Sequence, residues 1–121
     1  MSEQITLYER LGGREAVNFC VDEFYDRVMR DQRVYDIFNG VDMAKQRSMM
    51  KIYLCYAFGG AQGYSGRSMR EAHAHLGLTE DHFNAIAEDL VATLQKIGVE
   101  QSLIDECLAI VASTHDDVLN L

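Results

Sequence analysis

The segment Arg70–Phe83 reads Arg-Glu-Ala-His-Ala-His-Leu-Gly-Leu-Thr-Glu-Asp-His-Phe and holds three of the four histidines of the chain. Within it, Thr79 is a typical helix N-cap, and the acidic residues that follow favour the first turn of a new helix. Before this start, spacings of four and three place Met69, His73 and Leu76 on one helical face. A basic nitrogen between two large apolar side chains suits a ligand of a buried, hydrophobic cofactor. The competing interpretation is a core histidine bonded to a backbone carbonyl.

The chain length and composition favour one domain, residues 1–121, with a single core. Its 121 residues are 48% hydrophobic, which leaves room for one cofactor but not for a separate catalytic domain. No apolar run reaches the roughly 18 residues of a membrane span, and the polar start Met-Ser-Glu-Gln lacks the apolar core of a secretory signal. We therefore expect a cytoplasmic protein without a membrane partner.

The charge and the cysteines narrow the functional classes further. A formal net charge of −8 repels phosphate backbones and anionic lipid, so nucleic acid is not an expected partner. Cys20, Cys55 and Cys107 are odd in number and far apart, and each has apolar neighbours at helical spacing. They are typical of small buried hydrophobes in a reducing compartment and not of a disulfide or metal framework.

Apolar residues recur every three or four positions throughout the chain, and no segment alternates as a strand does, so the sequence predicts an all-α protein. Caps and glycines set the expected ends of the helices. The expected elements are a short helix from Thr6 to Gly12, a long helix from Arg14 to about Asp31, a turn or short helical corner at Val34–Gly40, a helix from Asp42 to Phe58, a helix from Thr79 to Gly98, and a last helix that fades near His115.

Taken together, these motifs resemble the group 1 truncated hemoglobins, most closely the cyanobacterial and protist members. The resemblance covers nearly the whole chain and implies an all-α truncated globin fold, a two-over-two helical sandwich around heme. Its motifs are Leu7–Gly13, Asp22–Val28, Phe38, Val41–Arg47, Tyr56–Gly60, Tyr64–Arg67, Met69–His73, Gly77–Leu78 and His82–Ile86.

The resemblance implies a b-type heme (iron protoporphyrin IX) whose iron is held by His73, the predicted metal ligand. On the opposite side it implies Tyr25 and Gln46 as hydrogen-bond donors to a bound diatomic ligand, which carries partial negative charge. A core tyrosine bonded to backbone is the alternative for Tyr25. Lys45, Arg67 or Arg70 could reach a heme propionate. The remaining residues expected to contact the cofactor are Phe24, Phe38, Met49, Met50, Tyr53, Leu54, Phe58, Met69, Leu78, Phe83, Ile86 and His115.

Two departures from the cyanobacterial pattern leave alternatives open. Met49 and Met50 stand where relatives commonly have histidine and glutamine, so the sixth iron position could be open or bound by water, by a thioether or by Tyr25. Some relatives bond a histidine near the end of the last helix to a heme vinyl group, and His115 lies close to that place. The alternative is an ordinary histidine at a helix end.

The resemblance implies a protein that reversibly binds O2, NO and CO, as in oxygen transport, and we expect it to be cytoplasmic and monomeric. A nitric oxide dioxygenase served by an unidentified reductase is a second hypothesis, since no flavin or nicotinamide motif is present. Electron transfer or redox sensing through six-coordinate iron is a third, and a heme-free helical interaction module is a fourth. A zinc site that uses His73, His75 and His82 lacks an obvious fourth ligand nearby.

Overall fold

A computed structural model describes residues 5–60, 73 and 77–119 of the chain. The expected cofactor contacts Met69 and Arg70, and the neighbouring Arg67 and His75, lie outside the described residues. His73 is described and has helical conformation. Within the described ranges the secondary structure is entirely helical, as the sequence predicts. The helices are α1 (Leu7–Leu11), α2 (Gly13–Val28), the 3-10 helix η1 (Tyr35–Phe38), α3 (Met43–Ala57), α5 (Glu80–Lys96), α6 (Gln101–Ser113) and α7 (His115–Leu119).

The three predicted N-caps are confirmed. The side chains of Thr6, Asp42 and Thr79 each accept a hydrogen bond from the backbone N–H three residues later, at 3.1–3.2 Å. At the start of α5 the cap is reciprocal, because the Thr79 N–H donates to Nδ1 of His82 at 3.1 Å. Such caps satisfy N–H groups that have no partner within the helix, which explains why α1, α3 and α5 begin where they do.

Two helix ends differ from the expectation. The second helix ends at Val28 and not near Asp31, because the Asp31 carboxylate accepts the backbone N–H of Arg33 at 3.0 Å and closes a turn. The last expected helix ends at Ser113, close to the prediction that it fades near His115, but a further helical turn, α7, follows from His115 to Leu119.

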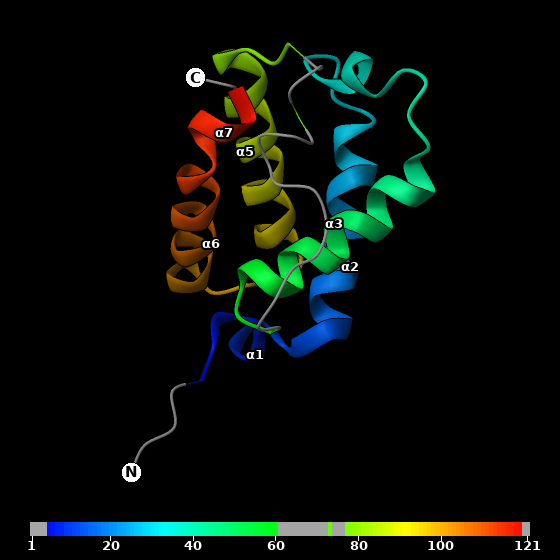
Figure 1. Cartoon of the computed structure of the whole chain (residues 1–121). Coiled ribbons are helices and arrows are strands. Elements are labelled where there is room, and N and C mark those ends of the chain that lie inside the picture. Colours follow the sequence, from blue (N-terminus) through cyan, green and yellow to red (C-terminus); the bar gives the residue numbers. More distant parts are fainter. Residues whose placement is uncertain (1–4, 61–72, 74–76, 120–121) are drawn as a thin grey trace.

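The helices form two packed pairs, and Figure 1 shows their arrangement. In one pair α3 packs across α2, and in the other α5 and α6 lie side by side. The pairs meet where α2 contacts α5, while α1 and α7 contact their ends. The predicted two-over-two sandwich is therefore confirmed. Its core includes Val17, Val21, Phe24, Val28, Leu90, Leu94 and Ile104. None of the helices in the described ranges combines the length and apolar character needed to cross a bilayer.

The cysteines are unpaired, as expected. Cys20 and Cys107 are buried, and Cys55 is half-buried. Burial raises the pKa of Cys20 to about 12 and that of Cys107 to about 11. Because the thiolate is the reactive form, these two thiols act as apolar core groups at neutral pH.

Asp89 is a buried acidic residue on α5. The apolar stripe of this helix predicts a core of apolar side chains and gives no sign of a buried carboxylate. Its side chain faces the turn after α2, with its Oδ1 atom 3.9 Å from Nη2 of Arg33. Only 7% of Asp89 is exposed, and its Oδ2 atom has no hydrogen-bond partner in the described part of the chain. Burial, together with the neighbouring Asp31 carboxylate, raises the pKa of Asp89 to about 7. In its protonated form Asp89 can donate to Asp31, so the pair prefers to hold one proton.

Because of the Asp31–Asp89 pair, we expect the protein to lose stability as the pH rises from 5 to 8. Because the folded pKa of Asp89, about 7, lies above its ordinary value of 3.8, its stabilising contribution is fully present below pH 3.8 and is lost as the pH rises to 7. The free energy of unfolding is therefore expected to fall as the pH rises from 5 to 8. Asp89→Asn keeps a donor for Asp31 without a titrating group, so denaturant unfolding of this variant should show a smaller fall. An equal fall in both proteins would refute the assignment.

Candidate functional site

A cavity of about 290 Å³ lies among the helices and contains the principal candidate site. Residues from α2, η1, α3, α5, α6 and α7 line it, together with His73, and most of their side chains are apolar. The lining includes many of the residues predicted from the sequence: Phe24, Tyr25, Phe38, Gln46, Met49, Met50, Tyr53, Leu54, His73, Leu78, Phe83 and Ile86.

Other lining residues were not singled out as cofactor contacts from the sequence. Those on α2 and α5 continue apolar stripes that predict core packing. Those on α6 and α7 belong to the last part of the chain, where only His115 was expected to contact the cofactor. They are Cys20, Val21, Val28, Ile37, Val41, Ala87, Leu90, Ile110, Val111, Thr114 and Val118. Helical periodicity could have found most of them, but it does not separate a residue that faces a cavity from one that faces another helix.

A hydrogen bond between Tyr25 and Gln46 is the main polar feature of this cavity. Tyr25 lies on α2 and is 1% exposed, while Gln46 is half-buried in the first turns of α3. The Gln46 amide nitrogen donates to the Tyr25 hydroxyl oxygen at 3.0 Å. Because the oxygen accepts this bond, the phenolic hydrogen remains available as a donor to another group.

The Tyr25 hydroxyl stays protonated at neutral pH. Burial raises the pKa of Tyr25 to about 12, although the hydrogen bond from Gln46 and the charge of Arg47 act in the opposite direction. A neutral phenol can donate a hydrogen bond, whereas a phenolate cannot. The pair thus presents a donor within a largely apolar cavity, where a hydrogen bond is stronger than in water.

The ring of Tyr25 is held in place by its neighbours. Its centroid lies 5.1 Å from that of Phe24 and 5.9 Å from that of Phe38, with the rings edge to face. The guanidinium carbon of Arg47 lies 5.9 Å from the same centroid. Packing therefore fixes the orientation of the ring and, with it, the position of the hydroxyl oxygen.

His73 lines the same cavity as Tyr25 and Gln46 and is half-buried. The cavity thus brings together an imidazole from a segment after residue 60, a phenol from α2 and an amide from α3. Met49 and Met50 add two thioethers to its wall. Imidazole and thioether groups are both ligands of iron, and the surrounding side chains are suited to a flat, apolar group.

Two residues expected to contact the cofactor, Lys45 and Phe58, are not among the lining residues of this cavity. Lys45 is exposed on α3, and its backbone N–H is part of the Asp42 cap. Phe58 is 5% exposed, but it belongs to the core beyond the end of α3, where its carbonyl accepts the N–H of Tyr8 at 2.9 Å. This backbone bond places Phe58 beside α1 and not among the lining residues.

His115 likewise lies outside the lining and makes polar contacts at the start of α7. Its Nε2 contacts Glu80 at 2.5 Å, and its Nδ1 contacts Asp116 at 2.9 Å. Its ring packs edge to face on Phe83, a lining residue, with centroids 5.0 Å apart. The Asp116 and Glu80 carboxylates raise the pKa of His115 above its ordinary value of 6.5.

The fold and the cavity together define a small helical protein that can enclose a flat apolar cofactor. A family model described as bacterial-like globin matches residues 6–120. The group 1 truncated hemoglobin GlbN of Synechocystis sp. is 54% identical over 121 residues, a match that covers 95% of this chain and 98% of that protein. That of Tetrahymena pyriformis is 38% identical, and the match covers 98% of each protein.

Solved structures agree with these sequence matches. The 2/2 hemoglobin from Synechococcus sp. PCC 7002, in the cyanomet state and with covalently attached heme, superposes with a TM-score of 0.92 at 50% identity, over 97% of this chain and 100% of that one. The Fe(III) form of the Tetrahymena pyriformis truncated hemoglobin gives a TM-score of 0.90 at 38% identity, over 95% and 98%. The chain belongs to the bacterial-like globin family, among the group 1 truncated hemoglobins. This membership implies heme as the cofactor.

Proposed function

We propose that the protein holds one b-type heme through His73 and reversibly binds O2, NO and CO on the opposite side, beside Tyr25 and Gln46. The observation that carries this proposal is the bonded Tyr25–Gln46 pair within an apolar cavity that His73 also lines. When bound, heme supplies an iron centre that takes diatomic ligands. The described residues fit this group, since the cavity offers an imidazole together with an apolar wall.

Each polar residue has a separate task in this proposal. His73 provides a neutral imidazole nitrogen to the iron, and its half-buried position limits competition from water. Tyr25 donates its phenolic hydrogen to the bound ligand, which carries partial negative charge. Gln46 donates to the phenol oxygen and so directs that hydrogen toward the ligand.

We propose that the heme is held without a covalent link through His115. Both ring nitrogens of His115 face carboxylates, so the ring would have to leave Glu80 and Asp116 before it could react with a vinyl group. Acid–acetone extraction should therefore remove the heme. Heme that stays with the polypeptide would instead indicate attachment through His115, in line with the covalently attached heme of the Synechococcus structure.

The two methionines support a second candidate function. Met49 and Met50 both line the cavity from α3, so either thioether is placed on the wall of the pocket. Ligation by methionine favours ferrous iron and raises the reduction potential, as in electron-transfer cytochromes. We assign these side chains to the pocket wall and leave the sixth position to the exogenous ligand. A six-coordinate spectrum that becomes five-coordinate in Met49→Leu or Met50→Leu would support electron transfer or redox sensing instead.

Optical spectroscopy of the ferrous protein tests the proposed function. Under argon we expect a five-coordinate spectrum that converts to an oxygenated form in air and returns when oxygen is removed. Irreversible oxidation or a heme-free polypeptide would contradict reversible binding. Addition of NO to the oxygenated form separates storage or transport from nitric oxide dioxygenation, since only the latter yields nitrate at each turnover when a reductase is supplied.

We also propose that the protein is a single domain, that it is a monomer and that it is cytoplasmic.

A further inference from the structure

We propose that Arg47 is a positioning residue of the ligand pocket, which fixes α3 and the Tyr25 ring relative to each other and thereby sets the hydrogen bond to the bound ligand. This inference rests on the proposed function. Arg47 follows Gln46 directly in α3 but does not line the cavity. Its contacts lie on α2, the helix that carries Tyr25.

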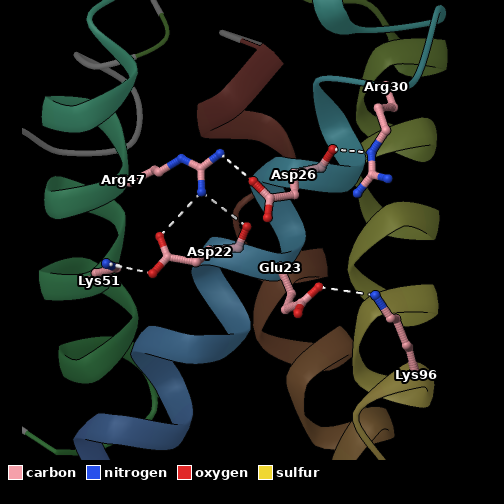
Figure 2. A network of polar contacts seen from close by, with 7 residues as sticks. All are labelled: Asp22, Glu23, Asp26, Arg30, Arg47, Lys51 and Lys96. Carbon is pink, nitrogen blue, oxygen red and sulfur yellow. Dashed lines mark hydrogen bonds and ion pairs between the residues drawn. The ribbon is translucent and has the colours of Figure 1, made fainter.

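The guanidinium of Arg47 joins two successive turns of α2, as Figure 2 shows. Its Nη2 donates to Asp26 at 2.7 Å, and its Nη1 donates to the carbonyl and the carboxylate of Asp22 at 3.2 and 3.3 Å. Asp22 and Asp26 are four residues apart and share one face of the helix. The planar fork of an arginine can bind both carboxylates at once, whereas a lysine offers a single charged centre.

The same guanidinium also lies over the ring of Tyr25. Tyr25 immediately precedes Asp26, and its ring centroid lies 5.9 Å from the guanidinium carbon of Arg47. A cation at this distance interacts favourably with an aromatic face. The ring is therefore confined by Arg47 as well as by Phe24 and Phe38.

These contacts couple the two groups that face the ligand. The Tyr25–Gln46 bond of 3.0 Å joins α2 to α3, and the Arg47 contacts join the same two helices one residue further along α3. A small slide or rotation of α3 on α2 would change both sets of contacts together. The positive charge of Arg47 also polarises the phenolic O–H toward release of its proton, which strengthens the phenol as a donor.

A simple helix clamp is the competing explanation, and the neighbouring ion pairs provide matched controls. Lys51, four residues after Arg47, also pairs with Asp22, at 3.0 Å, so it joins α3 to α2 in the same region. Lys96 pairs with Glu23 at 3.2 Å and joins α2 to α5 instead. Figure 2 shows these pairs beside the Arg47 contacts. Ion pairs at or near the surface contribute little to stability, so replacing either lysine should have a small effect on folding.

The test uses heme-loaded Arg47→Gln. It measures the rate of oxygen release from the oxygenated form and the frequency of the C–O stretching band of the CO-bound form. We expect release to be about three- to tenfold faster and the band to shift to higher frequency, because the donor to the ligand is weakened and misplaced. Lys51→Gln and Lys96→Gln should leave both values unchanged. Arg47→Lys, which keeps a charge but loses the fork, should fall between wild type and Arg47→Gln, and it provides the test if Arg47→Gln does not fold.

In a Tyr25→Phe background, Arg47→Gln should change oxygen release very little, because the group that Arg47 positions is gone. Wild-type release rates in the Arg47 variants, or equal changes in Lys51→Gln, would overturn the positioning role while leaving the proposed function intact. Absence of heme or of oxygen binding in the wild-type protein would overturn the proposed function itself.

Discussion

Replacing His73 with glycine is expected to abolish axial ligation of the iron and to weaken heme binding by at least roughly a hundredfold. His73 is the one histidine that lines the cavity in the described ranges, and it does so together with Tyr25 and Gln46. Glycine removes the imidazole without adding bulk, so the variant should lose the wild-type ferrous spectrum. Free imidazole should restore that spectrum, since it can fill the space left by the side chain. Hemin titration followed by optical spectroscopy measures both effects.

His82→Gln is the matched control for this experiment. His82 accepts the N–H of Thr79 and closes the cap of α5, a task that glutamine performs at the same helix position. The His82 variant should keep the wild-type spectrum and heme affinity. An unchanged spectrum in His73→Gly, or an equal loss in His82→Gln, would contradict the assignment of the proximal ligand.

Replacing Tyr25 with phenylalanine is expected to accelerate oxygen release by about tenfold. The substitution keeps the ring between Phe24 and Phe38 but removes the hydroxyl that can donate to the ligand. One hydrogen bond in an apolar pocket contributes about 1–2 kcal/mol, which corresponds to roughly a tenfold change in rate. Stopped-flow displacement of oxygen by CO measures the release rate, and the C–O stretching band should move to higher frequency.

Tyr35→Phe makes the same chemical change at an exposed position on η1 and should leave release unchanged. Gln46→Leu should also accelerate release, because the phenol loses the donor that directs its hydrogen. The two effects should be less than additive in the double variant, since both act through one bond of 3.0 Å. A wild-type release rate in Tyr25→Phe would show that the hydroxyl does not contact the ligand.

Local signals in the sequence predict much of this fold. Thr6, Asp42 and Thr79 precede helices whose first turns need an acceptor, and the structure shows all three bonds. The apolar stripe predicts an end of α2 near Asp31, three residues beyond the observed end at Val28, because it does not reveal that Asp31 closes a turn through the N–H of Arg33. Periodicity reports which residues are buried, while a side-chain bond of this kind decides where a helix stops.

The candidate site is less accessible to sequence reasoning, because it depends on contacts between distant residues. The resemblance to a known family indicated Tyr25 and Gln46, but only the structure gives the bond between them. Arg47 had no distinguishing signal besides its place after Gln46, since its partners Asp22 and Asp26 lie more than twenty positions away on another helix. Phe58 is an aromatic residue of the kind expected in the pocket. Its carbonyl accepts the N–H of Tyr8, however, and this bond places it beside α1 in the core.

The most direct test of the account is resonance Raman spectroscopy of the ferrous, ligand-free protein with and without 15N-labelled histidine. We predict an iron–histidine stretching band that moves to lower frequency on labelling and is absent from His73→Gly. A band that persists unchanged in His73→Gly would show that another residue holds the iron. A polypeptide that takes up no heme would contradict the account as a whole.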